Sequence, residues 1–131
     1  MNYSSKIGEM NYDGLISDIT PAAVVTGAII RKETTKKAVY TRGTVFAKSS
    51  VDSKLVILGT AASDNETLEA YAILTDDVEV DTSTDVSATF YIAGCFDLAK
   101  CAVKTEYAIT EADKDALRKY GIIFKNASAS S

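Results

Sequence analysis

The stretch VSATFYIAG, Val86–Gly94, shows the clearest periodicity of the chain. Its even-numbered positions are apolar or glycine, and Ser87, Thr89 and Tyr91 alternate with them. Because successive side chains of a strand point to opposite faces of the sheet, this pattern predicts a strand. One of its faces should lie in a core and the other should be half-exposed.

Four further stretches rich in β-branched and apolar residues predict more short strands. They are residues 22–30, 38–47, 54–59 and 68–80. The polar run RKETTKK, Arg31–Lys37, lies between the first two and is expected to form the solvated tip of a hairpin. Many short strands, few glycines and no internal repeat predict a β-rich domain that is barrel-like or sandwich-like.

One segment near the C-terminus, TEADKDALRKYG, carries the signals of a helix. Thr110 and Asp113 can form a capping box, and Gly121 suits the left-handed position after the last turn. Residues 121–124, GIIF, should then return as a short strand. The fold class predicted is therefore β-rich α+β, with one short C-terminal helix. An apolar stripe of this helix would pack on the sheet and consists of Ala112, Ala116, Leu117 and Tyr120.

The composition divides the chain into three segments. Residues 1–20 are polar with single apolar side chains, and Pro21 marks their end. We expect residues 1–20 to be a flexible N-terminal arm that can add a strand to a partner's sheet edge, with a frayed terminus as the alternative. Residues 21–125 should form the β-rich domain, and residues 126–131 a disordered polar tail. The candidate partner-binding residues of the arm are Tyr3, Met10, Tyr12, Leu15, Ile16 and Ile19.

The charge and hydropathy of the chain argue against two kinds of partner. The 131 residues are 47% hydrophobic and carry a net charge of −4, and the 14 basic residues are scattered. A nucleic-acid-binding surface needs clustered Lys and Arg, so we expect no nucleic-acid partner. The longest apolar segment, residues 21–30, is far too short to span a bilayer, and no secretory signal is evident. We therefore expect no membrane partner and synthesis in a host cytoplasm.

The sequence also lacks the common catalytic and cofactor motifs. It has no His, which removes the usual acid–base residue and any Ser-His-Asp arrangement, and it contains no GxxxxGK[ST], GxGxxG or GxSxG string. The acidic pairs Asp76-Asp77 and Asp64-Glu66 stand outside any calcium-loop pattern and are expected to be solvated. We expect no enzyme, no catalytic residue, no cofactor and no metal.

Two pairs of residues have a structural and a functional interpretation. Cys95 and Cys101 are six positions apart, which is not a CxxC spacing, and are expected to be buried apolar residues rather than a local disulfide. Arg42 and Gly43 interrupt an apolar run without the neighbouring glycines of a phosphate-binding loop. Gly43 should mark a bulge or a close approach of the backbone, and Arg42 an exposed or interface side chain.

Four segments occur in a familiar order and spacing: RGTVFA, AYAILTDDVEV, ATFYIAGCFDLAKC and DALRKYGIIF. With these segments the chain resembles the small head decoration proteins of tailed phages, a capsid-stabilising group typified by the decoration protein of lambda-like phages. The resemblance runs from about Gly14 to Phe124. It lies in the order of the four segments, and no single motif is diagnostic.

The resemblance implies a β-tulip-like domain that assembles as a homotrimer on the outer surface of the phage capsid. There it would bind the major capsid protein after the shell expands and stabilise the shell against the pressure of the packaged DNA. The arm would become ordered on the shell, so its removal should leave folding intact. Another virion β domain, from a tail or fibre, and a small trimeric ligand-binding or enzymatic domain are the alternatives. The core residues that the resemblance implies are Leu74, Val78, Phe90, Ile92, Leu98, Leu117 and Ile122.

Overall fold

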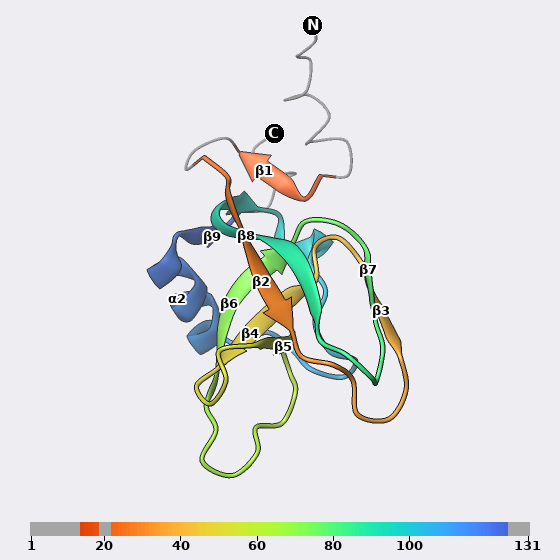
Figure 1. Cartoon of the computed structure of the whole chain (residues 1–131). Coiled ribbons are helices and arrows are strands. Elements are labelled where there is room, and N and C mark those ends of the chain that lie inside the picture. Colours follow the sequence, from red (N-terminus) through yellow and green to blue (C-terminus); the bar gives the residue numbers. More distant parts are fainter. Residues whose placement is uncertain (1–13, 19–21, 126–131) are drawn as a thin grey trace, which may run out of the picture.

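Nine strands and one α-helix make up most of the part of the chain that the structure, a computed structural model, describes (Figure 1). This part comprises residues 14–18 and 22–125. The elements are β1 (Ile16–Asp18), β2 (Val24–Ile30), β3 (Ala38–Tyr40), β4 (Val45–Ser49), β5 (Leu55–Ile57), β6 (Leu68–Leu74), β7 (Val78–Val80), β8 (Val86–Phe96), the 3₁₀ turn η1 (Leu98–Lys100), α2 (Glu111–Tyr120) and β9 (Ile122–Phe124).

Five of the strands close into a small barrel. Strand β8 pairs with β2 and β6, and β4 pairs with β6 and β5, all of them antiparallel. A parallel contact between Ile30 of β2 and Leu55 of β5 closes the ring. Strands β3 and β7 form a separate two-stranded ribbon beside the barrel. The expected β-rich α+β domain with a barrel and one helix near the C-terminus is therefore confirmed.

The interior of the barrel holds one of two hydrophobic cores. Tyr40 and Phe90 each make an edge-to-face ring contact with Phe46, in both cases with centroids 5.2 Å apart. Such aromatic pairs add to the free energy gained by burying the rings. The fully enclosed members of this core are Ile30, Phe46, Leu55, Ala72, Leu74, Val80 and Phe90.

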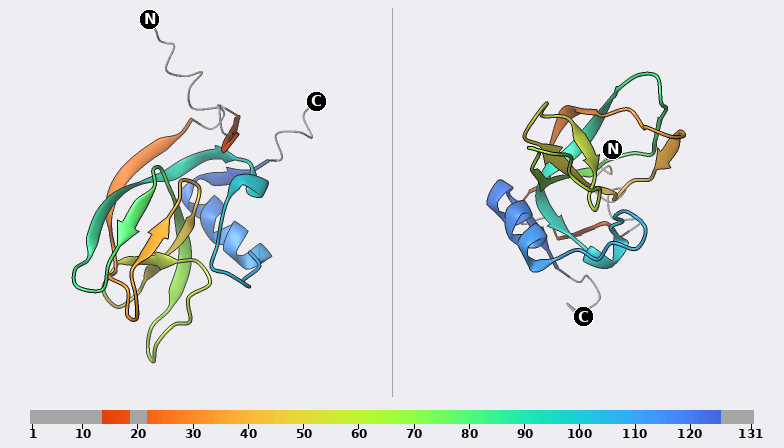
Figure 2. Two further views of the ribbon diagram at one scale, coloured as in Figure 1. Left: turned by 90° about the vertical axis from the view of Figure 1, so that its right-hand side faces the viewer. Right: turned by 90° about the horizontal axis from the view of Figure 1, so that it is seen from below.

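The second core lies on the outer face of β4, β6 and β8, because alternate residues of a strand point outward from a barrel. Ile73 and Tyr91, for example, are cross-strand partners on β6 and β8, and both are buried there. Helix α2 and the segment after η1 cover this face (Figure 2). The buried members of this core are Leu15, Ile16, Val45, Ala47, Leu58, Ala70, Ile73, Tyr91, Phe96, Leu117 and Ile122.

Four of the seven expected core residues are almost fully buried in these two cores, and the other three are partly buried. Val78 and Ile92 are partly buried against the barrel core, whereas Leu98 is half-buried outside both clusters. The remaining four are almost fully enclosed and are Leu74, Phe90, Leu117 and Ile122.

The stretch from 38 to 47 differs from the single strand expected there. It forms β3 and β4 with a turn at Arg42-Gly43 between them, so Gly43 lies in a turn and not inside a strand. Gly43 has φ +97°, and a Cβ at this position would lie 2.8 Å from the carbonyl oxygen of Lys100. The close backbone approach expected at Gly43 is therefore present, with positive φ as a second requirement for glycine.

The expected hairpin around RKETTKK is wrong. Strand β3 pairs with β7 and not with β2, because β2 is paired to β8 on one side and contacts β5 on the other. Residues of the polar run instead form ion pairs and a hydrogen bond with neighbouring segments of the chain. Arg31 contacts Asp52 at 3.0 Å and Glu66 at 2.6 Å, and the hydroxyl of Tyr40 donates to Glu33.

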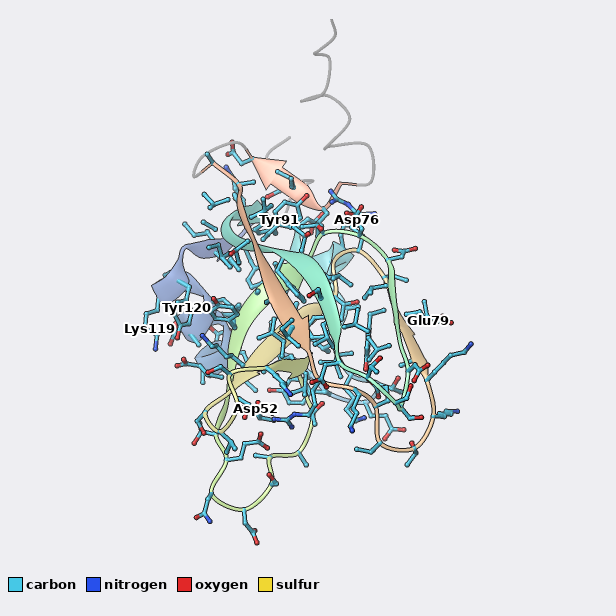
Figure 3. All side chains as sticks on the ribbon, in the orientation of Figure 1. Asp52, Asp76, Glu79, Tyr91, Lys119 and Tyr120 are labelled. Carbon is cyan, nitrogen blue, oxygen red and sulfur yellow. The ribbon has the colours of Figure 1, made fainter. Side chains whose placement is uncertain are left out.

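Helix α2 has the ends expected from its sequence. The Thr110 side chain accepts from the Asp113 N–H, the Asp113 carboxylate accepts from the Thr110 N–H, and Gly121 has φ 114°. Of the expected apolar stripe, Leu117 is buried and Ala116 is partly buried, whereas Ala112 and Tyr120 are exposed. The hydroxyl of Tyr120, which is labelled beside Lys119 in Figure 3, donates to Glu69 of β6 at 2.8 Å.

Candidate functional site

The beginning of the described chain is part of the folded domain. Strand β1 pairs antiparallel with the end of β8, and the N–H of Asp97 donates to the Leu15 carbonyl at 2.8 Å. Leu15 and Ile16 are 1% and 4% exposed and belong to the outer core. These two candidate arm residues therefore pack inside their own chain, which the polar character of residues 1–20 did not indicate.

The other candidate residues of the arm, Tyr3, Met10, Tyr12 and Ile19, lie outside the described residues, as does the tail 126–131. Of the candidate arm residues, the structure therefore describes only Leu15 and Ile16. They lie at the end of the barrel where β1, β8, β9 and η1 meet, which we call the root of the arm (Figure 1).

Arg42 is half-buried at the same end of β8 and holds loops of its own chain. Its Nη1 donates to the hydroxyl of Tyr91 at 2.7 Å and to the carbonyl oxygen of Thr75 at 3.1 Å, and its guanidinium lies 5.6 Å from the Tyr91 ring centroid. Its backbone N–H donates to Asp77. Arg42 was expected as an exposed or interface residue, and these contacts give it a structural role beside the root of the arm.

A shallow hollow of about 450 Å³ opens between η1, β9 and α2. Lys114, Arg118 and Lys125 line it together with Asp97, whose carboxylate accepts the Ala99 N–H at 3.0 Å. Each of the three cations has a carboxylate partner at 3.0–3.2 Å. The cations of the hollow are thus balanced by carboxylates of the same chain, and the hollow offers no set of groups aligned for a reaction.

Three of the four carboxylates in the acidic pairs accept hydrogen bonds from their own chain. Asp77 accepts from the Arg42 N–H, and Asp76 accepts from the Thr75 hydroxyl. Glu66 is the most constrained carboxylate, because the Ser49 hydroxyl, Ser63 and Arg31 all donate to it. These bonds, that from Ser49 foremost, lower the pKa of Glu66 to about 2. Glu66 is therefore a structural anchor of the loop before β6.

Both cysteines are free thiols. Cys95 is 2% exposed in β8, with its Sγ 3.4 Å from the Ser17 hydroxyl of β1. Cys101 follows η1, and burial raises the pKa of its thiol to about 12. Since the thiolate is the nucleophile, the raised pKa disfavours Cys101 as a reactive thiol.

No group of three or more Cys, Asp or Glu side chains is positioned to hold a metal ion within residues 14–18 and 22–125. In the same part of the chain, no helix is long and apolar enough to cross a membrane.

One surface feature was missed at the level of sequence. Strand β2 leaves three apolar side chains exposed: Val24 by 48%, Val25 by 53% and Ile29 by 40%. A signal was present, since residues 22–30 contain no charge and have a glycine inside an apolar run. This run was interpreted only as a strand, because periodicity does not tell which face a second layer covers.

Two comparisons with known proteins find no match. A scan against models of protein families finds no match to the chain, and no curated protein matches it significantly. The function must therefore be argued from the residues and the fold.

Proposed function

We propose that this protein is a virion structural protein of the head decoration type. It binds the outer surface of an expanded phage capsid as a homotrimer, contacts the major capsid protein and stabilises the shell against internal DNA pressure. The observation that carries the proposal is the ordered set of four segments, RGTVFA, AYAILTDDVEV, ATFYIAGCFDLAKC and DALRKYGIIF.

The four segments contribute to three of the five barrel strands, whereas β2 and β5 lie outside them. The first gives the Arg42-Gly43 turn and β4, and the second gives β6, its turn and β7. The third contains most of β8 and η1, and the fourth contains the end of α2 and β9. The resemblance thus involves strands that form the cores as well as turns, which supports the proposal.

The charge of the protein is compatible with a position on the outside of a capsid. The net charge is −4, and a subunit on the outer surface does not contact the packaged genome. An acidic surface would oppose any direct contact with phosphates.

The burial of Leu15 and Ile16 narrows the part of the arm that is available for the capsid. The two side chains are in the outer core of the domain, so they are not the anchors we assign to the shell. We assign that role to the aromatic and apolar residues before them, Tyr3, Met10 and Tyr12. Ordering this segment on a shell costs conformational entropy, which backbone hydrogen bonds to a capsid strand and burial of these anchors would offset.

Cosedimentation with heads of the phage that encodes the protein tests the proposal. We expect saturable binding to expanded undecorated heads and none to unexpanded heads. The double variant Tyr3→Ser with Tyr12→Ser should bind more weakly, whereas Val39→Ser, an exposed valine of the β3–β7 ribbon, should bind like the wild type. Equal binding to both kinds of head, or to neither, would overturn the proposal.

A further inference from the structure

Strand β3 has one edge without a strand partner within the described residues. It pairs only with β7, in the separate ribbon at the right of Figure 1. A hollow of about 500 Å³ is lined by Ala38, Val39 and Tyr40 in succession. Because successive side chains of a strand point to opposite faces, a hollow that touches all three borders the edge of the strand. No residue of β7 lines the hollow, so this is the edge that faces away from β7.

The segment after η1 forms another wall of this hollow, through residues 102–105. Backbone hydrogen bonds fix this segment to the barrel. The Ala102 carbonyl accepts from the Val45 N–H at 2.8 Å, and the Lys104 N–H donates to the Leu58 carbonyl at 2.9 Å. The free edge of β3 therefore borders a hollow with a second, fixed wall.

The hollow is basic, although the chain as a whole has a net charge of −4. A smaller hollow of about 170 Å³ shares part of its lining. Five basic side chains and one carboxylate line the two hollows, and they are Arg31, Lys32, Lys36, Lys37, Lys104 and Glu33. The one carboxylate already accepts a hydrogen bond from the hydroxyl of Tyr40.

Three of these lysines have no carboxylate partner of their own chain. Lys37 contacts Glu79 of β7 at 3.1 Å. Lys32, Lys36 and Lys104, by contrast, are exposed and form no ion pair within residues 14–18 and 22–125. Cations gathered around a hollow attract an anionic group to it. The occupant that matches this hollow is therefore negatively charged.

We propose that the free edge of β3 binds an extended acidic segment of another protein, which adds to the β3–β7 ribbon as a third strand. Its carboxylates lie toward Lys36 and Lys104, and the apolar side chains between them contact Ile57 and Val103 in the lining. The inference stands on this edge and its lysines and does not rest on the proposed function.

Two properties of the edge select this occupant. An edge strand offers unpaired N–H and C=O groups, which a peptide backbone satisfies in full. The phosphate backbone of a nucleic acid has acceptors but no matching row of donors. The lysines also oppose pairing with the same edge of a second copy, because like charges would meet there.

Fluorescence anisotropy with a labelled synthetic peptide and the full-length protein tests the inference. The probe is a peptide of about ten residues in which glutamate alternates with valine and threonine, the pattern of an added strand. We expect saturable binding that weakens as the salt concentration rises. A peptide with lysine in place of glutamate should not bind. The glutamate peptide with every backbone nitrogen methylated keeps its carboxylates but lacks the N–H donors, and it should not bind either.

Two double variants test the lysines against a matched change of net charge. Lys36→Gln with Lys104→Gln should weaken binding of the glutamate peptide about three-fold to ten-fold, since each exposed charge pair contributes modestly. Lys119→Gln with Lys125→Gln removes the same charge elsewhere on the surface and should bind the peptide like the wild type. Both pairs are exposed lysines, and equal melting temperatures of the variants show that folding is retained.

Several results would overturn the inference. They are no binding of the glutamate peptide, equal binding of the lysine or the methylated peptide, and equal weakening by the two double variants. Removal of residues 1–13 could raise the affinity for the glutamate peptide about ten-fold, which would make the chain's own N-terminal segment the occupant. Self-association of the wild type that the peptide reverses would identify a second copy instead.

Discussion

Gly43 and Gly27 differ in whether the fold of their own chain requires a glycine. Gly43 adopts φ +97° beside the Lys100 carbonyl, whereas Gly27 has an ordinary strand conformation with open space. We expect Gly43→Ala to lower the free energy of unfolding by about 1–3 kcal/mol, because it adds both strain and a contact at 2.8 Å. Gly27→Ala should raise it by about 0.4–1 kcal/mol in the monomer.

Urea unfolding at low protein concentration measures both changes. The pair is informative because the substitutions are chemically identical and their expected effects have opposite sign. If Gly43→Ala proved as stable as the wild type, the described turn between β3 and β4 would be incorrect.

Glu66 should give the protein a marked acid sensitivity. Hydrogen bonds from Ser49, Ser63 and Arg31 lower its pKa from 4.5 to about 2 in the folded state. A carboxyl group with a lowered pKa stabilises the fold fully above its unfolded pKa, and this contribution is lost as the pH falls from about 4.5 towards 2. Glu66→Gln should therefore be less stable near neutral pH and lose less stability over that interval.

Thermal melting at a series of pH values tests the role of Glu66. Asp52 and Asp85 also have lowered pKa values through Arg31 and Lys54, so the variant should keep part of the acid sensitivity. A Glu66→Gln protein whose melting temperature falls with pH as steeply as that of the wild type would contradict the role given to Glu66.

At the scale of elements, strand β1 stabilises the domain, although its sequence was interpreted as part of a flexible arm. Leu15 is 1% exposed in the outer core, so Leu15→Ala should lower the free energy of unfolding by about 2–5 kcal/mol.

Removal of residues 1–20 should destabilise the domain for the same reason, which reverses the expectation drawn from the sequence. Removal of residues 1–13 should change stability little. The account of β1 fails if denaturant unfolding finds the two truncations equally stable.

The capping box of α2 should contribute a smaller amount to the free energy of unfolding than Leu15 does. Thr110→Ala removes the acceptor for the Asp113 N–H and should lower the free energy of unfolding by about 1 kcal/mol. Thr105→Ala, at an exposed threonine in the loop before the helix, is the control and should be neutral. Equal stability of the two variants in guanidinium would show that the cap is unimportant.

Local signals in the sequence were sufficient for several elements. The alternation in β8 and the caps of α2 depend on residues close in the chain, and both were predicted correctly. Strand pairing depends on distant residues, so the hairpin around Arg31–Lys37 and the single strand over 38–47 were predicted wrongly. Turns at Arg42-Gly43 and at Asp76-Asp77 break two long apolar runs into four strands.

At the scale of the whole molecule, the barrel closes through contacts that no short stretch encodes. The parallel contact of Ile30 with Leu55 and the second core under α2 arise from the arrangement of the strands in space. The same limit applies to the candidate site. The sequence identified the apolar residues near the N-terminus, but only the fold separates the buried Leu15 from the exposed Val25.

The central claim is that the protein stabilises an expanded capsid. The most direct test heats DNA-filled heads that lack the protein and measures the temperature at which DNA is released. With saturating wild-type protein we predict release at a higher temperature, and with the Tyr3→Ser, Tyr12→Ser variant a smaller shift at the same concentration. Release at an unchanged temperature from heads that carry bound protein would contradict the claim.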